Sequence, residues 1–145
     1  MTLFKKLLVA SALVAFGSVA ASAQNIVEMR VAKMKEIGGA MGGLSKMAKG
    51  EDPYDAGRAT QLATLVRGHS TQIVGWFPSG STGGRAKAEI WTDSAKFKDA
   101  AGALTQQADA LVRVAATGKD AMAAQFGNVG RSCGGCHTPF RAEAK

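Results

Sequence analysis

Two cysteines and a histidine lie within five residues of one another in the run Cys133-Gly-Gly-Cys136-His137. This C-x-x-C-H spacing is the attachment pattern of c-type haem, in which two sulfurs bond the porphyrin edge and the imidazole binds the iron. In a helix that turns about 100° per residue, all three side chains leave the same side. We therefore predict one covalent haem c per chain, with Cys133 and Cys136 as thioether residues and His137 as the proximal iron ligand.

Three other chemistries use similar residues, and each explains the pattern less well. A disulfide between the two cysteines would close a very small loop, contribute little stability and leave His137 without a role. A thioredoxin-like redox pair is expected in a βαβ unit, which the sequence does not predict. Zinc held by the three residues and His69 would crowd three ligands onto five positions, unlike the common zinc patterns.

The segments that must position these residues have the period of amphipathic helices. Apolar residues recur at intervals of three and four in four segments, and no segment alternates like a half-buried strand. The predicted helices cover about 27–49, 55–76, 94–117 and 120–140; Gly50 and Pro53 end the first, and Asp93 or Ser94 can cap the third. Because short connections make successive helices antiparallel, we predict an all-α, up-down-up-down four-helix bundle with the haem near the C-terminal end of the last helix.

Each predicted helix has a stripe that should face the core. In the first it consists of Val27, Val31, Met34, Ile37, Met41 and Leu44; in the second of Leu62, Val66, Ile73 and Trp76, with His69 among them; in the third of Phe97, Ala101, Leu104, Ala108 and Leu111; and in the fourth of Met122, Phe126, Val129 and the haem motif. Between the second and third helices, the glycine- and serine-rich stretch 78–93 is predicted to be a loop pinned to the core by Ile90 and Trp91.

Residues 1–23 have the order of a cleavable secretory signal, with Lys5 and Lys6 before an apolar stretch and a small-residue site ending at Ala23. The apolar stretch of about 14 residues is shorter than the ~20 of a membrane-spanning helix, so no membrane anchor is expected. We predict export to the periplasm and a single domain over residues 24–145.

Removal of Lys5 and Lys6 lowers the formal net charge from +7 to +5. The remaining cations are scattered, which suits a solvated surface that steers acidic protein partners. Basic and aromatic residues do not interleave as in a nucleic-acid surface, so no nucleic-acid binding is expected.

The run from Cys133 through His137 to Phe140-Arg141, at the end of the last of four helices, resembles the class II c-type cytochromes, the cytochrome c' family. Supporting stretches are Arg30-x-x-x-Met34-Lys35, Lys49-Gly-Glu-Asp-Pro-Tyr-Asp55, Phe77-Pro78 and Ile90-Trp91. Ala88 departs from the proline of many relatives, which affects only the loop.

The resemblance implies that the residue over the second face of the iron is Met34. Its Met34-Lys35-Glu36-Ile37-Gly38 context is similar to the low-spin, methionine-ligated branch, in which a thioether keeps the iron six-coordinate and raises its potential. Two alternatives stay open. Met34 could simply fill core space like Met29, Met41 and Met47, and His69, the only other histidine, could bind the iron, although a packed histidine with one hydrogen-bonded nitrogen is the simpler interpretation.

By the same resemblance, Arg30 and Arg141 are expected to contact the haem propionates, for which a planar guanidinium is suited. The family also implies a homodimer, and the glycines of Gly38-Gly39 and Gly42-Gly43 allow either close helix approach or clearance for the haem. The predicted function is single-electron transfer to redox partner proteins with acidic docking faces. The alternative is a five-coordinate protein that binds nitric oxide or carbon monoxide, and no enzymatic activity is expected.

Overall fold

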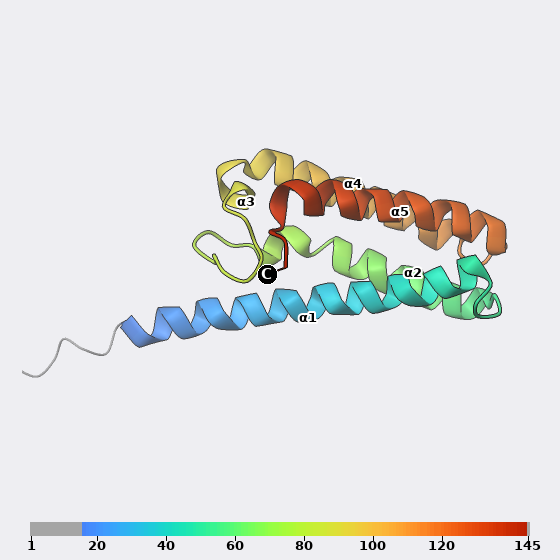
Figure 1. Ribbon diagram of the computed structural model, residues 1–145, viewed down its shortest axis with the longest axis horizontal. Helices are drawn as coiled ribbons and strands as arrows, with labels where there is room; N and C mark the ends of the chain where they lie inside the picture. Colours follow the sequence, from blue (N-terminus) through green and yellow to red (C-terminus); the bar gives the residue numbers. More distant parts are fainter. Residues whose placement is uncertain (1–15, 145) are drawn as a thin grey trace, which may run out of the picture.

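The computed structural model describes residues 16–144 and shows four long helices packed as a bundle (Figure 1). They are α1 (Phe16–Lys49), α2 (Ala56–Ser70), α4 (Ser94–Val114) and α5 (Lys119–Phe140), joined by the short η1 (Ile73–Trp76) and α3 (Glu89–Thr92). Successive long helices run in opposite directions, and α5 returns to lie against α1. The predicted antiparallel four-helix bundle is confirmed. Within residues 16–144 the only β-type pairing is an isolated bridge between Ala86 and Arg141.

The apolar stripe of α4 lies in the core as predicted, since Phe97, Ala101, Leu104, Ala108 and Leu111 are all buried. The stripe of α1 is wrong at one position, because Val31 is 42% exposed whereas Arg30 is buried. One residue corresponds to about 100° around a helix. Arg30, Ile37 and Leu44 follow one another at intervals of seven residues, about two turns, so all three lie on the same buried face of α1. Val31 is one residue further around the helix and falls at the edge of that face.

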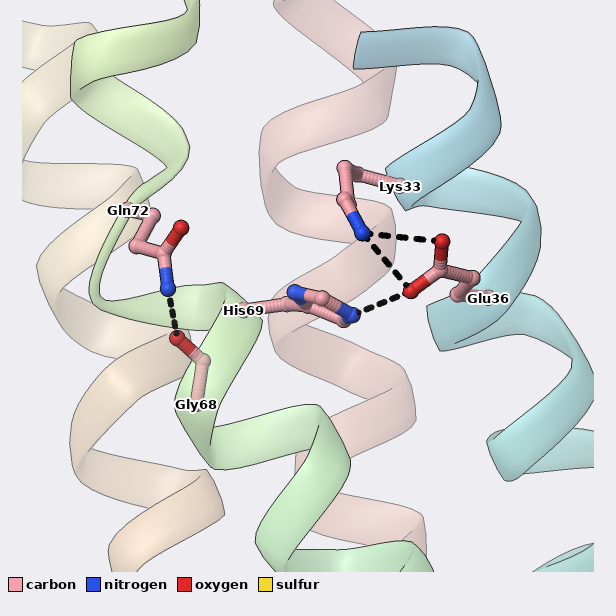
Figure 2. Close-up of polar contacts among 5 residues, drawn as sticks. All are labelled: Lys33, Glu36, Gly68, His69 and Gln72. Carbon is pink, nitrogen blue, oxygen red and sulfur yellow. Dashed lines mark hydrogen bonds and ion pairs between the residues drawn. The ribbon is translucent and has the colours of Figure 1, made fainter. Parts of the chain in front are cut away.

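The second helix ends earlier than predicted, at Ser70 rather than Trp76. The Ser70 and Thr71 hydroxyls donate to the carbonyls of Arg67 and Gly68 at 2.8 and 2.9 Å. The side-chain amide of Gln72 also donates to the Gly68 carbonyl, at 3.2 Å, as Figure 2 shows. In a continued helix these carbonyls would accept from backbone N–H groups, and here side chains at the helix end donate to them. The chain then tightens into η1, which places Trp76 in the core.

The helices α1 and α2 approach closely at Gly43. A methyl group added there would lie 2.8 Å from Leu62 Cδ1, whereas one added at Gly38, Gly39 or Gly42 would meet no atom within 4 Å. Gly43 therefore serves contact between helices inside the bundle.

The predicted signal peptide falls mostly outside the described residues, and its cleavage after Ala23 stays a prediction. The backbone of α1 is helical from Phe16 onward. Among the helices of residues 16–144, none has the length and apolar character needed to cross a membrane.

Candidate haem-binding site

The C-x-x-C-H motif occupies the last two turns of α5. Cys133, Cys136 and His137 are half-buried, whereas Gly134 and Gly135 are exposed and a methyl group at either would meet no neighbour. Both cysteines are free thiols that pack against the hydrophobic core. The motif therefore turns its two sulfurs toward the core and its two glycines toward solvent, and the imidazole of His137 is half-buried.

The surroundings favour the neutral forms of all three reactive groups. Burial raises the pKa of the Cys133 and Cys136 thiols, and for Cys136 the neighbouring Cys133 charge adds to the effect. Burial also lowers the pKa of His137, with smaller contributions from the Arg141 and Arg85 cations. An imidazole must be neutral to offer a nitrogen lone pair to a metal. His137 is thus kept in the form that binds iron.

The loop between η1 and α3 is fastened to the end of α5 beside the motif. The backbone N–H of Lys87 donates to the Phe140 carbonyl at 3.0 Å, and that of Ala142 donates to the Arg85 carbonyl at 2.8 Å. The Arg85 side chain closes the contact by donating from Nε to the Ala142 carbonyl at 2.7 Å. The loop therefore holds the chain directly after His137 in place.

The other end of this loop is pinned to the core by aromatic residues. As expected, Ile90 is buried, and Trp91 donates from its indole nitrogen to the Pro78 carbonyl at 3.0 Å. Phe77 packs edge-on against Phe97, which packs edge-on against Phe140, with ring centroids 5.1 and 5.3 Å apart. An aromatic row thus connects the loop to the last turn of α5.

Arg30 ties α1 to the same loop. Its guanidinium donates to the Ser81 and Gly83 carbonyls, both at 2.7 Å, and lies 4.6 Å from the centroid of the Phe77 ring. Burial lowers the pKa of Arg30, and among residues 24–144 no carboxylate lies within ion-pair distance of it. The structure thus assigns several of its donors to the loop. The predicted contacts of Arg30 and the exposed Arg141 with haem propionates stay predictions.

Replacing Arg30 with alanine is expected to lower the free energy of unfolding by about 2–4 kcal/mol, because it leaves the Ser81 and Gly83 carbonyls without their donor. The matched control is Arg113→Ala, at an exposed position near the end of α4, with an expected change within about 0.5 kcal/mol. Urea unfolding of the two variants measures the difference. Equal losses would show that the Arg30 contacts with the loop do not stabilise the protein.

The two remaining candidates lie on α1 and α2. Met34 is half-buried, packs against the core and follows Arg30 by one turn of α1, the helix that packs against α5. His69 has a different partner, since its Nε2 lies 2.7 Å from Glu36 Oε2. No group of three or more His, Cys, Asp or Glu side chains in the described part of the chain converges to hold a metal. The arrangement therefore does not provide the zinc ligand set that includes His69.

The residues present fit a haem group. Two free thiols pack against the apolar core, a half-buried imidazole leaves the same side of the helix, and a methionine on the neighbouring helix packs against the same core. A metal bound by one imidazole and at most one thioether needs no cluster of three protein ligands when a porphyrin supplies the others. The fold and the site together define a c-type haem protein built as an antiparallel four-helix bundle.

Comparison with known proteins gives the family. The chain belongs to the cytochrome c' family, whose model matches residues 25–141. It is 36% identical to cytochrome c-556 of Agrobacterium fabrum over 116 residues, and this aligned region covers 79% of this chain and 80% of the relative. It is 34% identical over 132 residues to cytochrome c' of Cereibacter sphaeroides, covering 87% and 89%.

The fold is similar to that of solved members of the family. One of them is the nitric oxide complex of a variant of cytochrome c prime from Alcaligenes xylosoxidans. This chain superposes on it with a TM-score of 0.80 at 30% sequence identity, and the match covers 84% of this chain and 97% of that one. The predicted class II cytochrome and its covalent haem c are confirmed at the level of the family. The individual site residues stay predictions supported by their placement.

Proposed function

We propose that this protein carries single electrons, with the haem iron bound by His137 on one side and Met34 on the other. The observation that carries the proposal is the position of Met34, half-buried on the face of α1 that packs toward the core, in the helix adjacent to α5. When bound, the haem supplies an iron that alternates between the ferric and ferrous states. The chain would supply His137 and Met34 as iron ligands and an apolar enclosure for the haem.

The chemistry of the two side chains suits this role. Burial, together with the Arg141 and Arg85 cations, lowers the pKa of His137, which favours the neutral imidazole that can bind iron. A thioether is a neutral, soft ligand that raises the iron potential. The charged side chains that lower the pKa of His137 are Arg141 and Arg85, and arginines are poor proton donors and acceptors at neutral pH, so we propose a carrier rather than an enzyme.

The location and the partners belong to the same proposal. Members of the cytochrome c' family are periplasmic, and the predicted signal at residues 1–23 would bring this chain to the periplasm. The formal charge of +5 left after its removal favours redox partners with acidic docking faces. We also propose a homodimer through α1 and α2, which carry two exposed large apolar side chains, Val31 and Leu65.

A second candidate function is supported by a specific observation. Solved relatives include nitric oxide complexes of the cytochrome c prime from Alcaligenes xylosoxidans. If Met34 packs in the core without binding iron, the distal position is open, and this chain is then a five-coordinate protein that binds nitric oxide or carbon monoxide.

Absorption spectra of the exported holoprotein distinguish the two functions. A six-coordinate, low-spin ferrous spectrum that hardly changes with carbon monoxide is expected, because Met34 occupies the sixth position. A high-spin ferrous spectrum that shifts when carbon monoxide is added would reject the electron-carrier proposal in favour of the gas-binding one. The ferric spectrum, recorded in parallel, shows whether the same coordination holds in both oxidation states.

A further inference from the structure

A polar cluster of Lys33, Glu36 and His69 connects α1 to α2 (Figure 2). Glu36 accepts from Lys33 Nζ at 2.9 Å and, through its other oxygen, lies 2.7 Å from His69 Nε2. An ionised carboxylate can only accept, so His69 is the donor through Nε2–H. Lys33 and Glu36 both belong to α1, and the His69 contact is therefore the one that crosses between helices.

His69 is held firmly on its own side of this contact. Its side chain is 15% exposed, and its ring packs edge-on against Trp76 with centroids 5.9 Å apart. Trp76 itself is buried in the core. Because the packing against η1 already fixes the His69 ring, the ring loses little conformational entropy when it bonds to Glu36 on α1. A long, exposed lysine or arginine side chain would lose more.

The contact acts on the turn of α1 that carries Met34. Glu36 follows Met34 by two residues, which places the two side chains about 200° apart around the helix. Glu36 can therefore hold the backbone from the α2 side while Met34 faces the core. One turn earlier, Arg30 holds the same helix to the 81–83 loop. The Met34 turn thus lies between two polar ties to different elements.

We propose that Glu36 and His69 are positioning residues that set how closely the Met34 turn approaches the iron, and hence how readily a ligand enters the distal side. This inference rests on the proposed placement of Met34 over the iron. Neither residue contacts the reacting atoms. They act by fixing α1 against α2, so losing their contact should loosen the distal side while the motif on α5 stays intact.

The test measures the affinity of the ferrous holoprotein for carbon monoxide. His69→Ala removes the donor, and we expect the affinity to rise by about three- to tenfold, the equivalent of one hydrogen bond to a charged group at a partly exposed site. His69→Gln keeps an amide donor at a similar reach and should restore an affinity near that of the wild type. Glu36→Ala removes the acceptor at an exposed position and should reproduce the His69→Ala result.

Two matched controls separate positioning from general loosening. Lys33→Gln removes the other partner of Glu36 but no contact between helices. Asp109→Asn weakens the 2.9 Å ion pair with Arg67, which ties α2 to α4 instead of α1. Both should leave the carbon monoxide affinity within about twofold of the wild type, since Lys33 bonds only within α1 and Asp109 bonds only to α2, so neither change breaks a contact between α1 and α2.

The proposal is overturned if His69→Ala and Glu36→Ala leave the affinity unchanged, or if the two controls raise it equally. Urea unfolding of every variant shows whether a change in affinity merely follows stability. The spectrum of the wild type tests the proposed function separately. Should that spectrum be five-coordinate, the electron-carrier proposal fails, while the ratio of affinities between His69→Ala and the wild type still decides whether the pair controls distal access.

Discussion

Replacing both Cys133 and Cys136 with alanine is expected to abolish covalent haem attachment completely. The two thiols are the only cysteines in the sequence, and both lie free on the core side of α5. Without them the chain has no sulfur that can form a thioether bond to the porphyrin edge. The measurement is the mass of the exported polypeptide after denaturation, which retains the haem only where a covalent bond exists.

The neighbouring hydroxyl provides the matched control for this loss. Ser132 is half-buried one residue before the motif and donates to the Asn128 carbonyl at 3.3 Å, so Ser132→Ala perturbs the same turn without touching a thiol. It should keep the full haem complement. Each single cysteine variant should keep one thioether bond at most. Haem that stays bound to the denatured double variant would contradict the attachment site.

The chemistry of the site could be predicted because it is encoded locally. Cys133, Cys136 and His137 lie within five residues, and helix geometry alone decides that they leave one side. The bundle could be predicted for a similar reason, since the spacing from Phe97 to Leu111 repeats the helical period without interruption, and every position of that stripe is buried. Neither conclusion needs information about distant parts of the chain.

The burial of Arg30 could not be predicted in this way. A lone arginine is rarely buried, so the period of the first helix favoured Val31 for the core, and the structure exposes Val31 instead. What makes burial tolerable is a pair of carbonyls at Ser81 and Gly83, about fifty residues later in the chain. A glycine-rich loop has no period, and nothing in its composition shows where its carbonyls point.

The partners of Arg85 and His69 could not be predicted for related reasons, although the expected packed histidine with one hydrogen-bonded nitrogen is what the structure shows at His69. Arg85 reaches Ala142, which is 57 residues later, and His69 reaches Glu36, which is 33 residues earlier. Pairs this distant are set by how the helices pack rather than by local spacing. The early end of α2 is different, because Ser70, Thr71 and Gln72 are consecutive polar residues that can bond to their own helix carbonyls. That signal was present in the sequence.

Met34→Ala is expected to open the sixth position of the iron. If Met34 is unbound in about 1% of wild-type molecules, the variant's ferrous affinity for carbon monoxide should be about a hundredfold higher than that of the wild type. The apparent affinity of a site is reduced by the fraction of molecules in which it is accessible, so removing the internal ligand restores the full value. The iron should also become high-spin, and its reduction potential should fall, because a neutral soft ligand is lost. Carbon monoxide titration, absorption spectra and redox titration measure the three effects.

Two further variants decide whether Met34 acts as a ligand or as packing. Met34→Leu conserves the volume of the side chain, a swap that usually costs less than about 1.5 kcal/mol, but it removes the sulfur. A high-spin iron in this variant therefore shows that the thioether was bound. Met41→Ala is the control for packing, because Met41 is a half-buried methionine two turns further along α1. If Met41→Ala changes the spectrum as much as Met34→Ala, or if Met34→Leu stays low-spin, the sulfur of Met34 is not the sixth ligand, and the side chain contributes to the distal face only by packing.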